Sequence, residues 1–244
     1  MRVVFVGTSD AFGAGGRRQS AIFVEARSGG LLLDCAPTTL TGLAALGIER
    51  AAIDAIAISH FHGDHFAGLP LFLLAAVHED QRREALWIAG PPGVEARVRG
   101  VAEAMGFGLG SRTLPFPLHF VELDTDRELT VGPARIAAFA TYHQPEAQPH
   151  GLRVAADRRL LAYTGDTGWF EELPTRLAGA DLAITDCTFF EPGFEYHLDY
   201  TTLAARAGRF SCGRLLLTHL GPAMAERRGR LELETADDGL TLEL

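Results

Sequence analysis

Residues 59–65 read Ser59-His60-Phe61-His62-Gly63-Asp64-His65, which places three imidazoles and one carboxylate within six residues. Imidazole nitrogen and carboxylate oxygen are the ligands that a borderline cation such as Zn²⁺ takes. His60 and His62 alternate as on a strand end, so both can face one point, and Asp64 and His65 then turn toward a neighbouring point. Gly63 permits the sharp backbone path between the two pairs. The stretch therefore predicts a metal site, against the alternative of a polar loop that merely contains histidines.

Short apolar segments recur on both sides of this motif. Segments of this length, rich in Val, Ile and Leu, are typical of buried strands. We expect such strands at Val3–Val6, Leu31–Leu33, Ile53–Ile58, Ile136–Ala140, Leu160–Tyr163, Leu182–Thr185 and Leu215–Thr218. Patterns typical of helices lie between them, at Thr38–Leu46, Ala67–Val77, Val94–Met105, Trp169–Leu177 and Tyr200–Phe210. The alternation indicates a layered α/β architecture with helices outside a sheet core.

Two further segments have the pattern of antiparallel or edge strands. They are Leu114–Leu123 and Leu231–Leu242, and within the second Asp237-Asp238-Gly239 is typical of a hairpin turn. No repeat, low-complexity segment or clear linker divides the 244 residues. We therefore expect a single domain over residues 1–244, which is long enough to bury a sizeable core.

Composition limits the partners of the chain. The formal net charge is −9 and the sequence contains no Lys, whereas general nucleic-acid binding needs clustered cations. A small anionic substrate remains compatible, because a metal can supply local positive charge. Three cysteines without CxxC spacing argue against a disulfide framework and fit a reducing compartment. With no stretch typical of a signal peptide or a membrane span, we expect a cytoplasmic protein without a membrane partner.

The motif at residues 59–65 resembles the signature of the metallo-β-lactamase superfamily. That resemblance implies a four-layer α/β (α+β) fold, the αβ/βα sandwich, in which two mixed β-sheets face each other with helices on the outer faces. It also implies a dinuclear site at one edge, with further ligands from later strand ends. His143, Asp166 and His219 match that pattern in order and spacing, and each follows an apolar run.

The resemblance also implies how the ligands divide. One metal would be held by His60, His62 and His143, the other by Asp64, His65 and His219, with Asp166 as the bridge. Two zinc ions are expected, although Mn²⁺ or Fe also fit nitrogen and oxygen ligands of this kind. In such proteins the position of Asp34 usually supports a ligand histidine through its far imidazole N–H. The alternative for Asp34 is a strand-ending turn.

Several stretches resemble the ribonuclease Z-like and phosphodiesterase branch of this superfamily. They are residues 5–13, 15–20 and 32–36. In this branch a non-ligand histidine is thought to assist departure of the leaving group, and His197 stands at the matching point. A histidine that only packs at a helix start is the alternative, and Asp199 could either cap that helix or orient the imidazole. Arg17 and Arg18 lie in a Gly-rich loop, where they could contact an anionic substrate or remain solvated.

These implications favour a hydrolase that cleaves a small, anionic phosphodiester by metal-activated hydroxide, with Asp64 helping to orient the water and His197 acting as the acid. Residues 144–165 are too few for the long arm of bacterial tRNA-processing enzymes, which argues against tRNA as the substrate. Alternatives are a lactonase, thioesterase or sulfatase on the same scaffold, a tRNA 3′-processing endonuclease, or a non-catalytic metal-binding module. The sequence does not determine the oligomeric state and is compatible with a homodimer.

The remaining histidines and the aromatic residues near the motif carry weaker signals. His78, His119 and His150 have no motif support and are expected at surface or structural positions. Four aromatic residues flank ligand positions and could line a pocket or belong to the core: Phe61, Phe66, Trp169 and Phe170.

Overall fold

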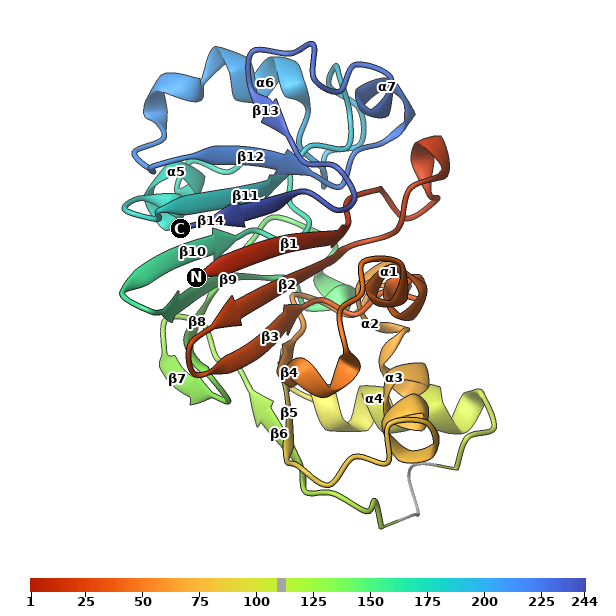
Figure 1. Cartoon of the computed structure of the whole chain (residues 1–244). Coiled ribbons are helices and arrows are strands. Elements are labelled where there is room, and N and C mark those ends of the chain that lie inside the picture. The colour runs from red at the N-terminus through yellow and green to blue at the C-terminus, as the bar shows by residue number, and fades with distance from the viewer. Residues whose placement is uncertain (109–112) are drawn as a thin grey trace.

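The protein is described by a computed structural model, which covers residues 1–108 and 113–244. Its strands form two seven-stranded sheets that lie face to face, and helices cover the outer side of each sheet (Figure 1). The four-layer αβ/βα sandwich implied by the sequence is therefore confirmed.

The first sheet has the order β14-β1-β2-β3-β4-β5-β6. Its strands are β1 (Arg2–Gly7), β2 (Ala21–Ala26), β3 (Gly29–Leu33), β4 (Ile53–Ala57), β5 (Leu86–Gly90), β6 (Leu118–Glu122) and β14 (Thr241–Glu243). Neighbours from β14 to β3 are antiparallel, and neighbours from β3 to β6 are parallel. The sheet is therefore mixed, with the carboxyl ends of β3 and β4 at the same edge.

The second sheet has the order β13-β12-β11-β10-β9-β8-β7. Its strands are β7 (Glu128–Val131), β8 (Ala134–Ala140), β9 (His150–Ala156), β10 (Arg159–Tyr163), β11 (Leu182–Asp186), β12 (Leu215–Thr218) and β13 (Glu234–Thr235). Strands β10 to β13 run parallel, whereas β7 to β10 are joined by antiparallel pairs. The parallel strands again end at one edge of the sheet.

The helices are short and lie mainly on the outer faces. They are α1 (Thr39–Ala45), α2 (Gly63–Phe66), α3 (Leu69–His78), α4 (Val94–Ala104), α5 (Leu173–Leu177), α6 (Tyr200–Ala205) and α7 (Pro222–Ala225), with 3-10 turns η1 (Ala14–Gly16), η2 (Arg50–Ala52), η3 (Pro145–Ala147) and η4 (Ala207–Arg209). Apolar side chains of α1, α3 and α4 pack against the first sheet, and those of α5, α6 and α7 pack against the second. No helix within the described ranges is long and apolar enough to cross a membrane.

Strand β1 shows why its sequence is apolar at every position. Val3 and Phe5 point into the core between the two sheets, whereas Val4 and Val6 point into the core beneath the helices. A strand that is covered on both faces loses the alternation of polar and apolar residues. The continuous apolar runs used to predict the strands are a direct consequence of this four-layer arrangement.

Most predicted elements are confirmed, and two helices are shorter than expected. The helix predicted at Trp169–Leu177 forms only at its end, as α5, and the helix predicted at Tyr200–Phe210 divides into α6 and η4. Within Leu114–Leu123 only Leu118–Glu122 forms a strand.

The hairpin predicted within Leu231–Leu242 is wrong. Strand β13 pairs with β12 in the second sheet, whereas β14 pairs with β1 in the first. The Asp238 carboxylate accepts hydrogen bonds from the backbone N–H groups of Thr8 and Arg18, which holds the tail against the first sheet. Residues 237–239 therefore cross between the sheets instead of folding back on themselves.

Candidate metal centre

All seven predicted ligand positions meet at one edge of the sandwich. Each follows the carboxyl end of a strand or lies in the short helix after β4: His60 and His62 after β4, Asp64 and His65 in α2, His143 after β8, Asp166 after β10 and His219 after β12. Both sheets therefore contribute to the same site, as the carboxyl edges of parallel strands commonly do in layered α/β folds.

One group of atoms consists of three imidazole nitrogens. His60 Nε2 lies 3.2 Å from His62 Nδ1, and His143 Nε2 lies 3.0 Å from the same atom. Asp166 Oδ2 completes the group at 3.7 Å from His60 Nε2. Two atoms that each lie about 2.1 Å from one tetrahedral zinc are about 3.4 Å apart, so this spacing suits a shared cation.

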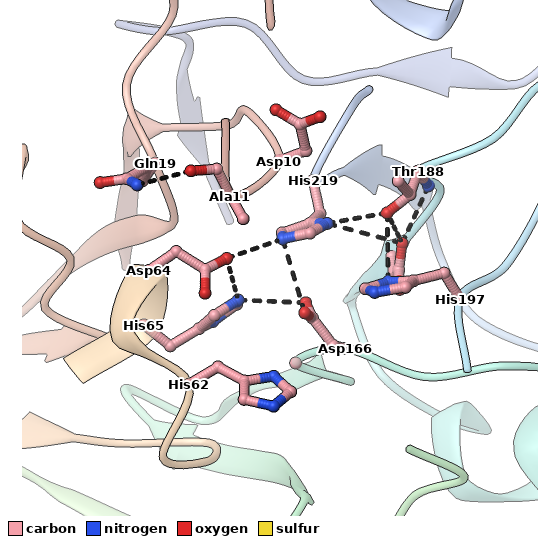
Figure 2. Close-up of polar contacts among 12 residues, drawn as sticks. Asp10, Ala11, Gln19, His62, Asp64, His65, Asp166, Thr188, His197 and His219 are labelled. Carbon is pink, nitrogen blue, oxygen red and sulfur yellow. Dashed lines mark hydrogen bonds and ion pairs between the residues drawn. The ribbon is translucent and has the colours of Figure 1, made fainter. Parts of the chain in front are cut away.

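A second group, formed by Asp64, His65 and His219, also includes Asp166 (Figure 2). Asp64 Oδ2 is 3.4 Å from His65 Nε2 and 3.3 Å from His219 Nε2. Asp166 faces both imidazoles, with Oδ1 at 3.2 Å from His65 Nε2 and Oδ2 at 3.5 Å from His219 Nε2. Asp166 therefore stands between the two groups and belongs to both.

The far nitrogens of four imidazoles are already engaged by acceptors outside the two groups. The Nδ1 partners are Ser59 Oγ for His60, Asp34 Oδ2 for His65, the Tyr196 carbonyl for His143 and Thr188 Oγ1 for His219, at distances of 2.8–3.0 Å. An acceptor at Nδ1 fixes the tautomer that leaves Nε2 without a proton. Each of these rings is therefore prepared to offer a lone pair toward the centre.

Two buried atoms at the centre lack hydrogen bonds. His65 Nε2 and Asp166 Oδ1 have no hydrogen-bond partner within the described part of the chain, although they face each other. Buried polar atoms without partners are costly, and they commonly mark the place of an ion. Together with the converging lone pairs, they show that the residues fit a metal centre.

Asp34 supports the predicted ligands through hydrogen bonds to His65 and to the residue before His60. Its carboxylate accepts from the Ser59 N–H at 2.7 Å, the Ser59 hydroxyl at 2.9 Å, His65 Nδ1 at 2.8 Å and the Tyr163 hydroxyl at 2.7 Å. The Asp34 backbone has a φ of 59°, in the left-handed region that Asp tolerates better than most residues. The strand-ending turn and the supporting carboxylate, treated as alternatives in the sequence, are therefore both present.

The carboxylates and imidazoles at the centre shift each other's pKa values. Burial alone would raise the pKa of the Asp166 carboxyl, but the imidazoles of His219 and His65 lower that pKa well below its usual range. Burial would lower the pKa of His65, yet the carboxylates of Asp166, Asp64 and Asp34 raise it well above its usual value. The carboxylates thus draw positive charge into a buried place, which is what a cation site requires.

A carboxylate that the sequence reasoning missed lies beside the two groups. Asp186 Oδ2 is 2.7 Å from His197 Nδ1, and Asp186 Oδ1 accepts from the Thr188 hydroxyl at 2.8 Å. Burial would lower the pKa of His197, but the Asp186 carboxylate raises it to about 9. Asp199, by contrast, caps α6 by accepting from the Thr202 N–H at 2.8 Å. The position of Asp186 at the end of an apolar strand was the available signal.

The structure does not bring Arg17 and Arg18 to the pocket. The Arg17 guanidinium is buried and donates to Thr8 Oγ1 and to the Ala236 carbonyl at 2.9 Å. Arg18 Nε lies 3.7 Å from Asp238 Oδ2 and donates to the Val6 carbonyl at 2.5 Å. Both arginines therefore bind the carboxyl-terminal tail or β1 and do not face the metal-binding atoms.

The aromatic residues and two of the remaining histidines named from the sequence lie outside the pocket lining. Phe61 and Phe66 pack in the core beneath the helices of the first sheet, and Trp169 and Phe170 pack at the edge of the core of the second. His150 Nδ1 lies 3.0 Å from the carbonyl of Gln148, and His119 stacks on Trp87. The open pocket is instead lined by Asp10, Ala11, Phe12, His62, Gly63, Asp64, Gln144, Asp166, Thr188, Phe189, Phe194, His197 and His219.

Known proteins resemble this chain over most of its length. A ribonuclease Z of Mycobacterium bovis is 28% identical, and the match covers 92% of this chain and 87% of that protein. The short form of human tRNase Z superposes with a TM-score of 0.77 at 24% identity, covering 100% of this chain and 99% of the other. A diphosphatase of the PhnP family gives a TM-score of 0.78 at 18% identity, covering 100% and 97%.

The names of two of these relatives run against the expectation that tRNA is not the substrate. The structural neighbours, all below 25% identity here, establish the fold and not the substrate. The model of the family described as the beta-lactamase superfamily domain matches residues 30–220, which include all seven of the predicted ligand positions. The protein therefore belongs to the metallo-β-lactamase superfamily of hydrolases.

Proposed function

We propose that this hydrolase is a dinuclear phosphodiesterase that acts on a small phosphodiester. The observation that carries the proposal is the Asp186–His197 pair, which stands beside both groups of metal-binding atoms without belonging to the ligand set expected from the family. A histidine that is held by a carboxylate and faces the pocket is suited to protonate a departing alkoxide.

The proposed ligands are those expected from the sequence. His60, His62 and His143 would hold one zinc ion, Asp64, His65 and His219 would hold the second, and Asp166 would contact both. Zinc bound there would supply a water of lowered pKa and polarise the non-bridging oxygens of the phosphate. Asp64 lines the pocket, where its carboxylate can orient the attacking water.

His197 provides the proton in this proposal. Its Nδ1 is engaged by Asp186, so Nε2 is the nitrogen left for a substrate in the pocket. The Asp186 carboxylate raises the pKa of His197, which favours the protonated ring that an acid needs. As the bond between phosphorus and the leaving oxygen breaks, Nε2 donates its proton to that oxygen, and the Asp186 carboxylate stabilises the ring in position.

The test combines metal content with turnover. Elemental analysis of the purified protein should find about two metal ions per chain, and hydrolysis of bis-p-nitrophenyl phosphate should stop when a chelator is added. Two metal ions without turnover of this diester, but with turnover of a lactone, thioester or sulfate ester, would replace the proposed bond type. Protein that binds no metal would overturn the dinuclear site itself.

Ribonuclease activity on tRNA is the second candidate, and the similarity to proteins named ribonuclease Z favours it. Two features favour the small substrate. Residues 144–165 are taken up by η3, β9 and β10, and the pocket lining within the described residues contains no Arg. A precursor tRNA with a 3′ trailer should therefore be cut far more slowly than a small diester. Efficient and accurate cleavage of that precursor would reverse the order of the two candidates.

A further inference from the structure

Two exposed aromatic side chains border the metal pocket. Among the described residues, four large hydrophobic side chains are exposed, and two of them, Phe12 at 94% and Phe194 at 47%, line this one cavity of about 380 Å³. Single exposed apolar side chains are ordinary on protein surfaces. Two that line one cavity beside the proposed metal ligands are a different case, because the size of the cavity suits a small organic molecule.

Phe12 is presented by a loop whose backbone is fixed. The buried Asp10 carboxylate accepts from the N–H groups of Phe12 at 3.2 Å and Ala14 at 3.1 Å, and from the Ser9 hydroxyl at 3.0 Å. Gly13 follows with a φ of 72°, which turns the chain sharply. The loop therefore holds the Phe12 ring in water beside the pocket and does not bury it in the core.

Phe194 borders the pocket beside the proposed proton donor. Its ring packs edge-to-face on Tyr196 at 5.3 Å between centroids and lies 6.2 Å from the ring of His197. Its carbonyl accepts from the His197 N–H at 3.0 Å. In Figure 2, Ala11, the neighbour of Phe12, and His197 lie on opposite sides of His219. Phe12 and Phe194 thus come from segments far apart in the sequence, and both line the same pocket.

The charges of the pocket limit the substrate further. Its lining carries the carboxylates of Asp10, Asp64 and Asp166, and no Arg from the described ranges reaches it. Metal ions would balance one phosphodiester. The imidazoles of the lining are the proposed metal ligands and the proposed acid, so no further side-chain cation is left there to balance a second phosphate. A substrate that fits has one anionic centre, and its remaining surface is uncharged.

We propose that Phe12 and Phe194 bind a planar aromatic group esterified to the phosphate, so that the substrate is an aromatic phosphodiester with a single negative charge. This assignment rests on the proposed phosphodiesterase function and names the substrate class of the same site. Stacking on an aromatic side chain favours a planar ring over an alkyl group of the same phosphate.

The test measures affinity without turnover. Zinc-loaded protein is titrated calorimetrically with phenylphosphonate and with methylphosphonate, which share one anionic head and differ in the aromatic ring. The wild type should bind phenylphosphonate more tightly. In the double variant Phe12→Ala/Phe194→Ala, the ratio of the two dissociation constants should fall by about 10- to 100-fold. Both side chains are exposed, so the variant should fold, and the exposed but distant Met105→Ala is the matched control that keeps the wild-type ratio.

Equal binding of both phosphonates by the wild type, or an unchanged ratio in the double variant, would overturn the aromatic subsite. Turnover of bis-p-nitrophenyl phosphate by the same preparation shows separately whether the phosphodiesterase proposal holds. If the wild type hydrolyses the diester while the ratio stays constant, only the subsite fails. If the wild type neither hydrolyses the diester nor binds either phosphonate, the proposed function is wrong, and the aromatic subsite, which rests on it, is wrong as well.

Discussion

His197 differs from the five histidines of the proposed ligand set because it lines the pocket without belonging to either group of proposed ligands. The Asp186–His197 distance of 2.7 Å makes the two residues one functional unit. We expect His197→Ala to lower kcat for an alkyl phosphodiester about 100-fold or more, and Asp186→Asn to lower it about 10- to 100-fold. Because the pair acts as a unit, the double variant should be no slower than His197→Ala alone.

The leaving group distinguishes an acid from a residue that only packs. A p-nitrophenolate ion departs without a proton far more readily than an alkoxide, so His197→Ala should lose much less kcat on bis-p-nitrophenyl phosphate than on the alkyl diester. Elemental analysis should show wild-type metal content in both single variants. Equal losses on both substrates, or loss of metal, would contradict the role of His197 as an acid.

Asp34 is a second residue whose effect should be seen through its neighbours. The Asp34 carboxylate is the acceptor in all four of its hydrogen bonds, and one of the donors is His65 Nδ1. In Asp34→Asn an amide N–H₂ replaces one acceptor and faces those donors. We expect a metal affinity about 10- to 100-fold weaker, because the orientation of His65 is lost. Competition with a chromogenic chelator measures this, and an unchanged dissociation constant would remove Asp34 from the support of the site.

At the scale of elements, the turn after β10 decides where Asp166 lies. Gly165 has a φ of +58°, and a Cβ on it would lie 2.7 Å from the Ser59 Cβ. Ser59 in turn accepts from His60, so the clash would reach both halves of the site. We expect Gly165→Ala to lower the free energy of unfolding by about 2–5 kcal/mol, from the left-handed backbone and the overpacking together. Urea unfolding of the metal-free protein measures the change.

Gly47 provides the matched control for this substitution. Its φ of +66° is similar, but no atom lies within 4 Å of the position that a Cβ would take. Gly47→Ala should therefore cost only the backbone term of about 1–2 kcal/mol. If the two variants lost equal stability, the close approach of Gly165 and Ser59 would not constrain the fold at this turn.

The elements also show what could be predicted from the sequence. Strands that are buried on both faces, such as β1 and β11, are recognisable in the sequence as apolar runs. The predicted ligands could be found because they come directly after such runs. The hairpin prediction for the carboxyl-terminal tail failed because a turn signal at Asp237–Gly239 describes only the local backbone. The strands on either side of it, β13 and β14, pair in different sheets. Asp186 was missed for a related reason, since its partner His197 is defined by tertiary contact and not by spacing. The same holds for Arg17, which is buried against the tail.

At the scale of the whole molecule, the site joins the two sheets. His60, His62, Asp64 and His65 follow β4 of the first sheet, whereas His143, Asp166 and His219 follow strands of the second. Each proposed metal ion would therefore have ligands from both sheets, in the same place where the inner faces of the sheets meet. Bound metal would then act as a cross-link between layers that are otherwise held by the apolar core.

This arrangement predicts that metal stabilises the fold and not only the active site. A ligand that binds only the folded state adds about 2.7 kcal/mol at a free concentration 100 times its Kd, and two such sites add more. We expect a chelator to lower the midpoint of urea unfolding of the zinc-loaded protein clearly, because it also leaves the buried carboxylate of Asp166 and the half-buried carboxylate of Asp64 without their counter-charge. Asp166→Ala removes the residue shared by both groups, so its midpoint should respond little to chelator. A wild-type midpoint that is the same with and without chelator would mean that the two sheets hold the site without help from the metal.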